Sequence, residues 1–273
     1  MQNSHLFPTH FVSHGAGPWP YMKQEWMIGA HDSLERALKL LPSTLPVRPQ
    51  AILVISAHWE EAQFTVMTNA HPPMLYDYGG FPAHTYQVQY PAPGAPALAQ
   101  RAYDLIAAAG LPVALNAQRG FDHGTFVPLS VSYPEADIPV FQVSLRADLD
   151  PAAHLALGRA LQPLREDGVL ILASGMTYHN HNMRNRGADA SGKSKQFDDW
   201  LFATLNSAPA ERWNQLINWA SAPMGREAHP REEHLIPLLV ALGASWEEPA
   251  VRTYYEPQYL GVATVSSYQF GGV

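Results

Sequence analysis

The chain contains no cysteine. Disulfide bonds, thiolate nucleophiles and metal sites with cysteine ligands, such as iron–sulfur clusters, are therefore excluded. A metal ion bound by this protein must instead be held by histidine, aspartate or glutamate side chains. The missing residue type thus limits the chemistry before any motif is considered.

Charged residues are also scarce, at 15% of 273 residues, and the formal net charge is -7. Nucleic acids and anionic membrane surfaces recruit clustered Lys and Arg, so neither is an expected partner. No apolar run approaches the roughly 20 residues that span a bilayer, and residues 1–5 do not resemble a signal peptide. We therefore expect a cytoplasmic protein that acts on a small molecule.

Hydrophobic residues make up 47% of the chain, enough for a full core, and predicted strands and helices alternate along it. This order predicts an α/β fold, with a single domain over residues 1–273 and a central, mostly parallel sheet flanked by helices. The expected strands are residues 9–13, 51–55, 64–68, 84–90, 113–116, 139–145, 169–173, 251–255 and 262–268. The expected helices are residues 33–41, 95–109, 151–165, 196–207, 210–220 and 230–243. Loops are expected at residues 71–82, 120–124 and 184–195.

Histidine is unusually frequent, with 13 residues, and three histidines follow separate predicted strands. His14, His58 and His179 each lie shortly after the carboxyl end of a strand, where the crevice of an open α/β sheet binds ligands. His234, near the start of a late predicted helix, is expected to reach the same edge. Neutral imidazoles gathered at one place are typical ligands of iron, zinc or copper. The alternative is that the four histidines are buried separately in the core, each with its own hydrogen-bond partner.

Other histidines show no such placement, and we expect them to be ordinary solvated side chains. They are His5, His10, His31, His71, His154 and His229.

Several motifs occur in the order in which a known family has them. They are Ser13-His14-Gly15, Ser56-Ala57-His58-Trp59, residues 76–82 with Gly-Gly-Phe-Pro, Tyr90-Pro91-Ala92-Pro93-Gly94, residues 120–124 and residues 230–239. With them the chain resembles the class III extradiol ring-cleavage dioxygenases, most closely the DOPA 4,5-dioxygenase type, from about residue 8 to residue 268. The resemblance implies an α/β fold and the insertion of both atoms of O2 into a catechol ring beside the diol.

The resemblance also implies roles for five histidines. The metal ligands of the family match His14, His58 and His234, and two further histidines of the site match His123 and His179. Many relatives have Glu in place of His234, so the three-histidine set is a departure from the wider class. It makes Zn(II) a credible occupant besides the Fe(II) expected for activity, with His179 as a possible fourth ligand to zinc.

The proposed chemistry requires proton transfers. Coordination of the substrate to the metal lowers the pKa of the catechol hydroxyls, and a base then removes the second proton. Imidazole suits this because its pKa lies near the operating pH. We expect His179 to be the main base and His123 to place O2 or donate a proton. For His123, the alternative is a loop histidine that ties Asp122 to the backbone.

Other side chains near these motifs have less certain roles. The aromatic residues Trp59, Tyr78, Phe81 and Tyr178 either line an aromatic pocket or pack in the core. A carboxylate on the substrate, as in DOPA, caffeate or protocatechuate, could be bound by Arg184, Arg186 or Lys193. Glu233 precedes His234 directly and, since neighbours on a helix differ by about 100°, its side chain is expected to point into solvent.

Two functions other than ring cleavage remain open on these residues. A zinc-dependent hydrolase uses three histidines to activate water, and a non-catalytic protein can bind a metal or ligand on the same scaffold. A binding protein has little need for both His123 and His179. The sequence leaves open whether the chain forms a homo-oligomer.

Overall fold

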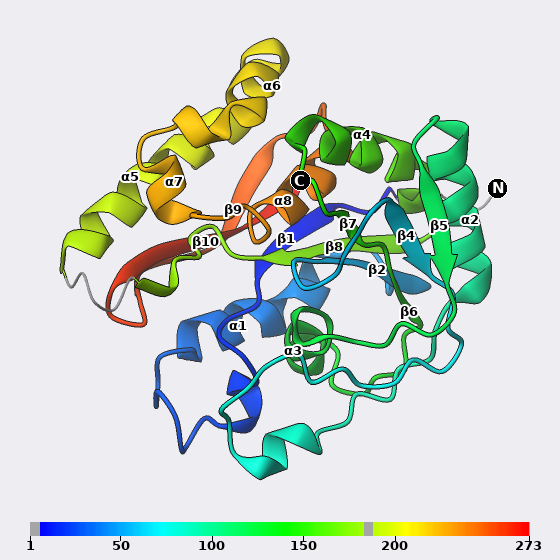
Figure 1. The fold of residues 1–273 in the computed structure, drawn as a ribbon, viewed down its shortest axis with the longest axis horizontal. Coiled ribbons are helices and arrows are strands. Elements are labelled where there is room, and N and C mark those ends of the chain that lie inside the picture. Colours follow the sequence, from blue (N-terminus) through cyan, green and yellow to red (C-terminus); the bar gives the residue numbers. More distant parts are fainter. Residues whose placement is uncertain (1–5, 183–187, 273) are drawn as a thin grey trace.

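The computed structural model describes residues 6–182 and 188–272, and its centre is a six-stranded sheet (Figure 1). Across the sheet the order is β6 (Val140–Gln142), β2 (Ala51–Ser56), β8 (Val169–Gly175), β1 (Thr9–Ser13), β10 (Ala263–Phe270) and β9 (Ala250–Tyr259). The first four strands are parallel, whereas β10 and β9 form an antiparallel pair at one edge. The predicted α/β fold with a mostly parallel sheet is confirmed.

Helices cover both faces of this sheet, which explains why every residue of β1, β2 and β8 is buried. On one face lie α1 (Asp32–Leu40) and α3 (His123–Ser132), and on the other lie α4 (Pro151–Leu161), α5 (Ala188–Leu205) and α8 (Ile236–Gly243) (Figure 1). The remaining elements are α2 (Pro96–Ala108), α6 (Pro209–Ile217), α7 (Gly225–Ala228), the pair β4 (Phe64–Met67) and β5 (Val113–Asn116), and the pair β3 (Glu60–Glu61) and β7 (Leu145–Arg146). Within the described ranges, no helix has the length and apolar character needed to cross a bilayer.

Helix α3 was not expected from the sequence, which favoured a loop around residues 120–124. Almost all of its residues are buried, and the polar ones among them are buried too, so it has no solvent-facing polar side and no amphipathic period to recognise. Asp122 caps the helix, because its carboxylate accepts the backbone N–H of Thr125 at 3.1 Å. His123 is consequently fixed in the first turn of a buried helix rather than in a loop.

Three other predicted elements differ from the structure. Residues 84–90 form no strand: a 3-10 turn covers Ala83–Tyr86, and the hydroxyl of Tyr76 donates to the carbonyl of Val88 in place of a neighbouring strand. The polar residues from 188 to 195 belong to α5 rather than to a loop. Helix α8 begins only at Ile236, because Pro237 lacks an N–H and disfavours helix in the residues before it.

Candidate active site

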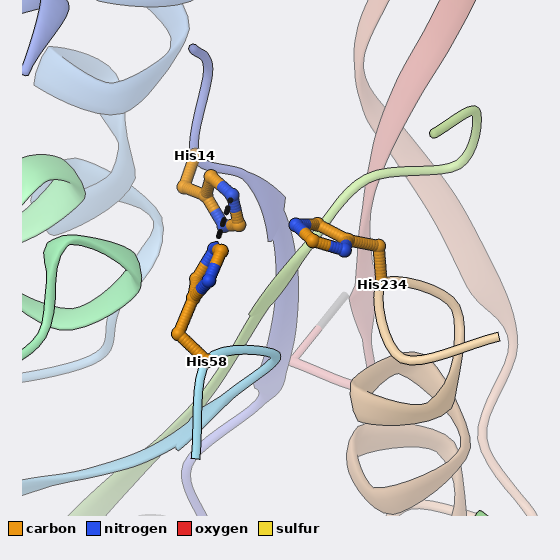
Figure 2. Close-up of side chains that lie close together, drawn as sticks. All are labelled: His14, His58 and His234. Atoms are coloured by element: carbon orange, nitrogen blue, oxygen red, sulfur yellow. Dashed lines mark hydrogen bonds between the residues drawn. The ribbon is translucent and has the colours of Figure 1, made fainter. Parts of the chain in front are cut away.

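Three of the predicted site histidines converge on one point at the carboxyl edge of the sheet (Figure 2). The Nε2 atoms of His14 and His58 lie 3.3 Å apart. The ring centroid of His234 lies 5.2 Å from that of His14 and 4.9 Å from that of His58. One nitrogen atom of each ring lies within 4.8 Å of the others, which is close enough for all three to bind one ion.

The parallel strands bring these histidines together from distant parts of the sequence. Ser13 at the end of β1 is paired with Gly175 of β8, and Ser56 at the end of β2 is paired with Ser174 of β8. The chain therefore leaves the sheet at the same level on three adjacent strands. His14 and His58 follow two of these ends directly, as the position of ligand sites in open α/β sheets predicts.

Two glycines allow the backbone to approach the cluster closely. A Cβ atom at Gly124 would lie 2.4 Å from Oγ of Ser56 and 2.9 Å from the ring of His58. A Cβ atom at Gly175 would lie 2.2 Å from the carbonyl oxygen of His234, whose position is fixed by the N–H of Met176 at 3.0 Å. Any larger residue at either position would push a histidine out of place.

His14 is oriented through its Nδ1 atom by a serine. Nδ1 lies 3.0 Å from the hydroxyl oxygen of Ser174, and that hydroxyl donates to the carbonyl of Gly124. Because the serine hydrogen is used by this carbonyl, Oγ accepts from an Nδ1–H of His14. The Nε2 atom of His14 is then the unprotonated nitrogen that faces the other rings.

Asp77 orients two further histidines. Both of its carboxylate oxygens lie 2.9 Å from Nδ1 of His123, and one of them also accepts the backbone N–H of His123. The same carboxylate lies 3.5 Å from Nδ1 of His58. Burial raises the pKa of Asp77, but its hydrogen bonds to His123 outweigh this effect and the net pKa is lowered. An ionised carboxylate only accepts, so Nδ1 of His123 carries the hydrogen.

Glu233 contacts His234 and His179 in the way that Asp77 contacts His123 and His58. The expectation that Glu233 points into solvent is therefore wrong. Its Oε1 atom lies 2.9 Å from Nδ1 of His234 and 3.2 Å from Nδ1 of His179. The expectation assumed a helix over residues 230–243, whereas residues 233–235 form a turn before α8. Burial raises the pKa of Glu233, but the hydrogen bond from His179 together with a backbone hydrogen bond and the charges of His179 and Arg231 outweighs this effect, and the net pKa is lowered.

The three converging rings are neutral at pH 7. Burial lowers the pKa of His14 and His234 well below the usual value, and neighbouring imidazoles lower it further. Burial and the proximity of His123 lower the pKa of His58 to about 3, despite the opposing charge of Asp77. Neutral imidazoles have a free lone pair for a metal ion. Two nitrogen ligands at ~2.1 Å from one ion lie about 3 Å apart, which agrees with the His14–His58 spacing.

The sequence was compared with known protein families, and the family that matches agrees with a metal site built from histidines. Residues 6–270 match the family described as the catalytic LigB subunit of aromatic ring-opening dioxygenase. The chain belongs to the LigB family. The predicted family is thereby confirmed, and the protein is an extradiol ring-opening dioxygenase of a metal-dependent family.

Individual relatives of this LigB protein are similar over nearly their full length. The 4,5-DOPA dioxygenase extradiol of Beta vulgaris is 40% identical, and the alignment covers 96% of each chain. The protein of the same name from Escherichia coli (strain K12) is 36% identical over 99% of this chain and 97% of its own. The dioxygenase tasH of Hapsidospora irregularis is 37% identical over 98% and 86%. The crystal structure of an uncharacterized protein from Escherichia coli K12 matches with a TM-score of 0.76 at 33% identity, covering 97% of this chain and all of that one.

The histidine cluster of this LigB protein opens into a cavity of about 620 Å³. Tyr78, Phe81 and Tyr178 line it, as one reading of the sequence proposed. Trp59 does not: it is buried beside the cluster, where its indole N–H donates to Glu61 at 2.9 Å and the guanidinium of Arg119 covers its ring. The cavity is large enough for a substituted catechol.

The charged lining of the cavity differs from the sequence expectation. Arg231 is the one Lys or Arg residue that lines it in the described part of the chain. Its side chain is 53% exposed, and its guanidinium pairs with both carboxylate oxygens of Glu60. Arg184 and Arg186 lie outside the described residues, and Lys193 does not line the cavity.

The structure also corrects the expectation for the remaining histidines. His71 is exposed, as expected, and His5 lies outside the described residues. Buried instead of solvated are His10, His31, His154 and His229. His154 shows how a buried ring is satisfied: its Nε2 accepts the backbone N–H of Arg146 at 3.1 Å and its Nδ1–H donates to the carbonyl of Asp150 at 2.7 Å.

Sequence reasoning missed several residues that contact the cluster or line the cavity. They include Asp77, Ser174, His181 and Arg231. A charged residue between Tyr76 and Tyr78, in a stretch expected to cover a pocket, was a usable signal for Asp77. Ser174 and His181 carry no comparable signal.

Proposed function

We propose that this protein cleaves the ring of a catechol-type substrate beside the diol, using O2, and that residues 1–273 form one catalytic domain. The observation that carries the proposal is the convergence of His14, His58 and His234 at the floor of a cavity that aromatic side chains line. DOPA, caffeate and protocatechuate represent the substrate class. Membership of the LigB family and the name of the Beta vulgaris relative support the same choice.

The three converging imidazoles would hold Fe(II) as the active metal. When bound, Fe(II) supplies open coordination positions for the diol and for O2, and it lowers the pKa of the substrate hydroxyls. The three neutral ligands leave the charge of the ion uncompensated. The donor set therefore also suits Zn(II), with His179 available as a fourth ligand because its ring is stacked on His234 at 3.4 Å between centroids.

His179 acts as the base in this proposal. Its Nδ1 contacts Glu233 at 3.2 Å, which leaves Nε2 to receive a proton from the substrate, and its side chain is 23% exposed at the cavity wall. The carboxylate of Glu233 compensates the charge that the ring acquires. This is the arrangement expected of a general base that a carboxylate orients.

His123 holds or donates a proton on the opposite side of the cluster. Its ring lies 3.9 Å from that of His58 and 5.4 Å from that of His14, between centroids. Asp77 fixes its Nδ1–H, so its Nε2 faces the cavity. In this position the ring can hydrogen-bond to an oxygen atom bound next to His58.

An oxygen-dependence experiment tests the proposal. Fe(II)-loaded protein is mixed anaerobically with DOPA, caffeate, protocatechuate or 4-methylcatechol, and air-saturated buffer is then added in a stopped-flow instrument. We expect a coloured ring-opened product only after oxygen is admitted, with one O2 consumed per catechol. No O2 uptake and no product with any of these catechols would contradict ring cleavage and favour the alternatives, a zinc-dependent hydrolase or a binding protein, since none of the four probes has a bond that a hydrolase could cleave.

A further inference from the structure

A second cavity, of about 430 Å³, lies between α1 and the strands β1, β9 and β10. It shares no lining residue with the cavity at the histidine cluster. The aliphatic part of its lining includes Val12, Leu34, Leu38 and Leu41, and the polar part includes Thr44, Ser267 and Gln269. At its mouth, Leu40 and Val251 are 63% and 39% exposed. The cavity is within the size range of small-molecule sites.

The imidazole of His10 lines this cavity from β1, and the phenol ring of Tyr254 lines it from β9. The hydroxyl of Thr9 donates to the carbonyl of Ala241 in α8, so the alternation of side chains along β1 directs His10 to the opposite face, toward α1. His10 is only 2% exposed. Its Nε2 atom is buried and has no hydrogen-bond partner in residues 6–182 and 188–272.

An unsatisfied buried nitrogen costs about 1–3 kcal/mol, so a group that reaches it gains that interaction. Burial lowers the pKa of His10 to about 4, which makes the ring neutral at pH 7 and able to donate or accept. Arg252 also lines the cavity, but its guanidinium is paired with Asp198 at 2.9 Å, so it offers little free counter-charge and a charged ligand would be disfavoured. Another protein surface could cover the mouth but could not reach an atom at the floor.

We propose that this cavity binds a small uncharged molecule with a single hydroxyl group, which hydrogen-bonds to Nε2 of His10 while its apolar body lies against α1. Ser267 supports the same chemistry from β10, because it lines the cavity and its oxygen accepts the N–H of Ser13 at 2.9 Å, a bond that does not use its own hydroxyl hydrogen. The ligand class is an alcohol with an alkyl body, and the site is separate from the ring-cleavage site.

The test uses 1-heptanol, which has no aromatic ring for the histidine cluster. It is titrated into the full-length protein while the ring signals of His10 are followed by NMR, with assignment by the His10→Leu variant. We expect a saturable shift of these signals. Ala37→Phe, which fills the cavity from α1, should abolish saturation, whereas His10→Leu should weaken binding by roughly 2–10-fold, measured by ligand-observed NMR. Both variants should retain catechol turnover.

Three results would overturn the proposal. The first is no saturable shift up to the solubility limit, in which case water alone satisfies His10. The second is unchanged affinity in Ala37→Phe, and the third is unchanged affinity in His10→Leu. If His10→Leu fails to fold, the wild-type titration and Ala37→Phe decide the question.

Discussion

The carboxylate of Asp77 contacts Nδ1 of His123 through both of its oxygen atoms, each at 2.9 Å. It also lies 3.5 Å from Nδ1 of His58, so one side chain contacts a proposed metal ligand and a proposed acid–base residue. Glu233 contacts His234 and His179 in the same way. Partners of this kind fix the tautomer and orientation of an imidazole. The two carboxylates therefore fix the orientation of all four rings before substrate binds.

The substitution Asp77→Asn tests whether the carboxylate orients the ring of His123. An amide is uncharged and accepts through only one of its two terminal atoms, so we expect kcat to fall roughly 10–100-fold, with a smaller loss of metal affinity because His58 is farther away. Steady-state kinetics and metal titration measure the two effects. Asp137→Asn, at an exposed partner of Arg48, is the matched control and should change neither. Unchanged kcat in Asp77→Asn would refute the assigned role.

Glu233→Gln should have a different signature, because both of its partners depend on the same oxygen atom. We expect metal affinity and kcat each to fall roughly 10–100-fold. Glu232→Gln removes the neighbouring carboxylate, which pairs with Arg226 away from the cluster, and should leave both values unchanged. Equal effects of the two substitutions would show that Glu233 acts only through its negative charge and not through its contacts with His234 and His179.

His179→Ala and His123→Ala separate proton transfer from metal binding. Loss of a general acid or base lowers the rate roughly 10²–10⁴-fold, so we expect ring opening to be nearly lost while Fe(II) content stays within about twofold. Metal analysis after anaerobic loading measures retention, and His71→Ala serves as an exposed-histidine control. Equal loss of metal in both variants would contradict the division of roles.

Arg231 is the one described Lys or Arg residue that lines the cavity, so we expect it to pair with a carboxylate of the substrate. Arg231→Met should raise KM for caffeate and protocatechuate about tenfold relative to 4-methylcatechol, and kcat should change little. Arg226→Met, at a second exposed arginine that does not line the cavity, is the matched control. If Arg231→Met affects all three catechols equally, the arginine does not select for the carboxylate.

The buried His154 predicts a pH dependence of stability. Burial lowers its pKa in the folded state to about 4, whereas the unfolded value is 6.5, so the unfolded state binds more protons between these values. The stabilising effect is present above pH 6.5 and is lost as the pH falls toward 4. At pH 5 the loss from this residue is about 2 kcal/mol.

Urea unfolding of chelator-treated protein at pH 7.5 and pH 5 measures this loss. We expect His154→Gln to reduce the difference between the two pH values, because glutamine does not titrate. His71→Gln, at an exposed position, should leave the difference unchanged. An identical pH dependence of wild type and His154→Gln would contradict the prediction.

Part of this site could be predicted because buried parallel strands are visible in the sequence. The apolar run of β2 ends just before His58, and topology alone brings the carboxyl ends of parallel strands to one edge. The positions of His14 and His58 followed from that rule. His234 does not follow a strand, but its place near the start of a late predicted helix put it at the same edge. The role of His123 was identified only through the resemblance.

Other features depend on tertiary contacts that no local pattern records. The direction of the Glu233 side chain depends on where α8 begins. The predicted helix began at residue 230 instead of Ile236, and on that longer helix Glu233 would point into solvent. The contact between Asp77 and His123 joins residues 46 positions apart. The burial of His10 and His154 likewise depends on α1 and α4 covering the sheet, which the residues themselves do not indicate.

Anomalous diffraction from crystals loaded anaerobically with Fe(II) tests the central claim most directly. We predict one strong peak at the iron edge, about 2.1 Å from the Nε2 atoms of His14, His58 and His234. A peak bound by any other set of side chains, or no peak in protein that contains iron by metal analysis, would contradict the account.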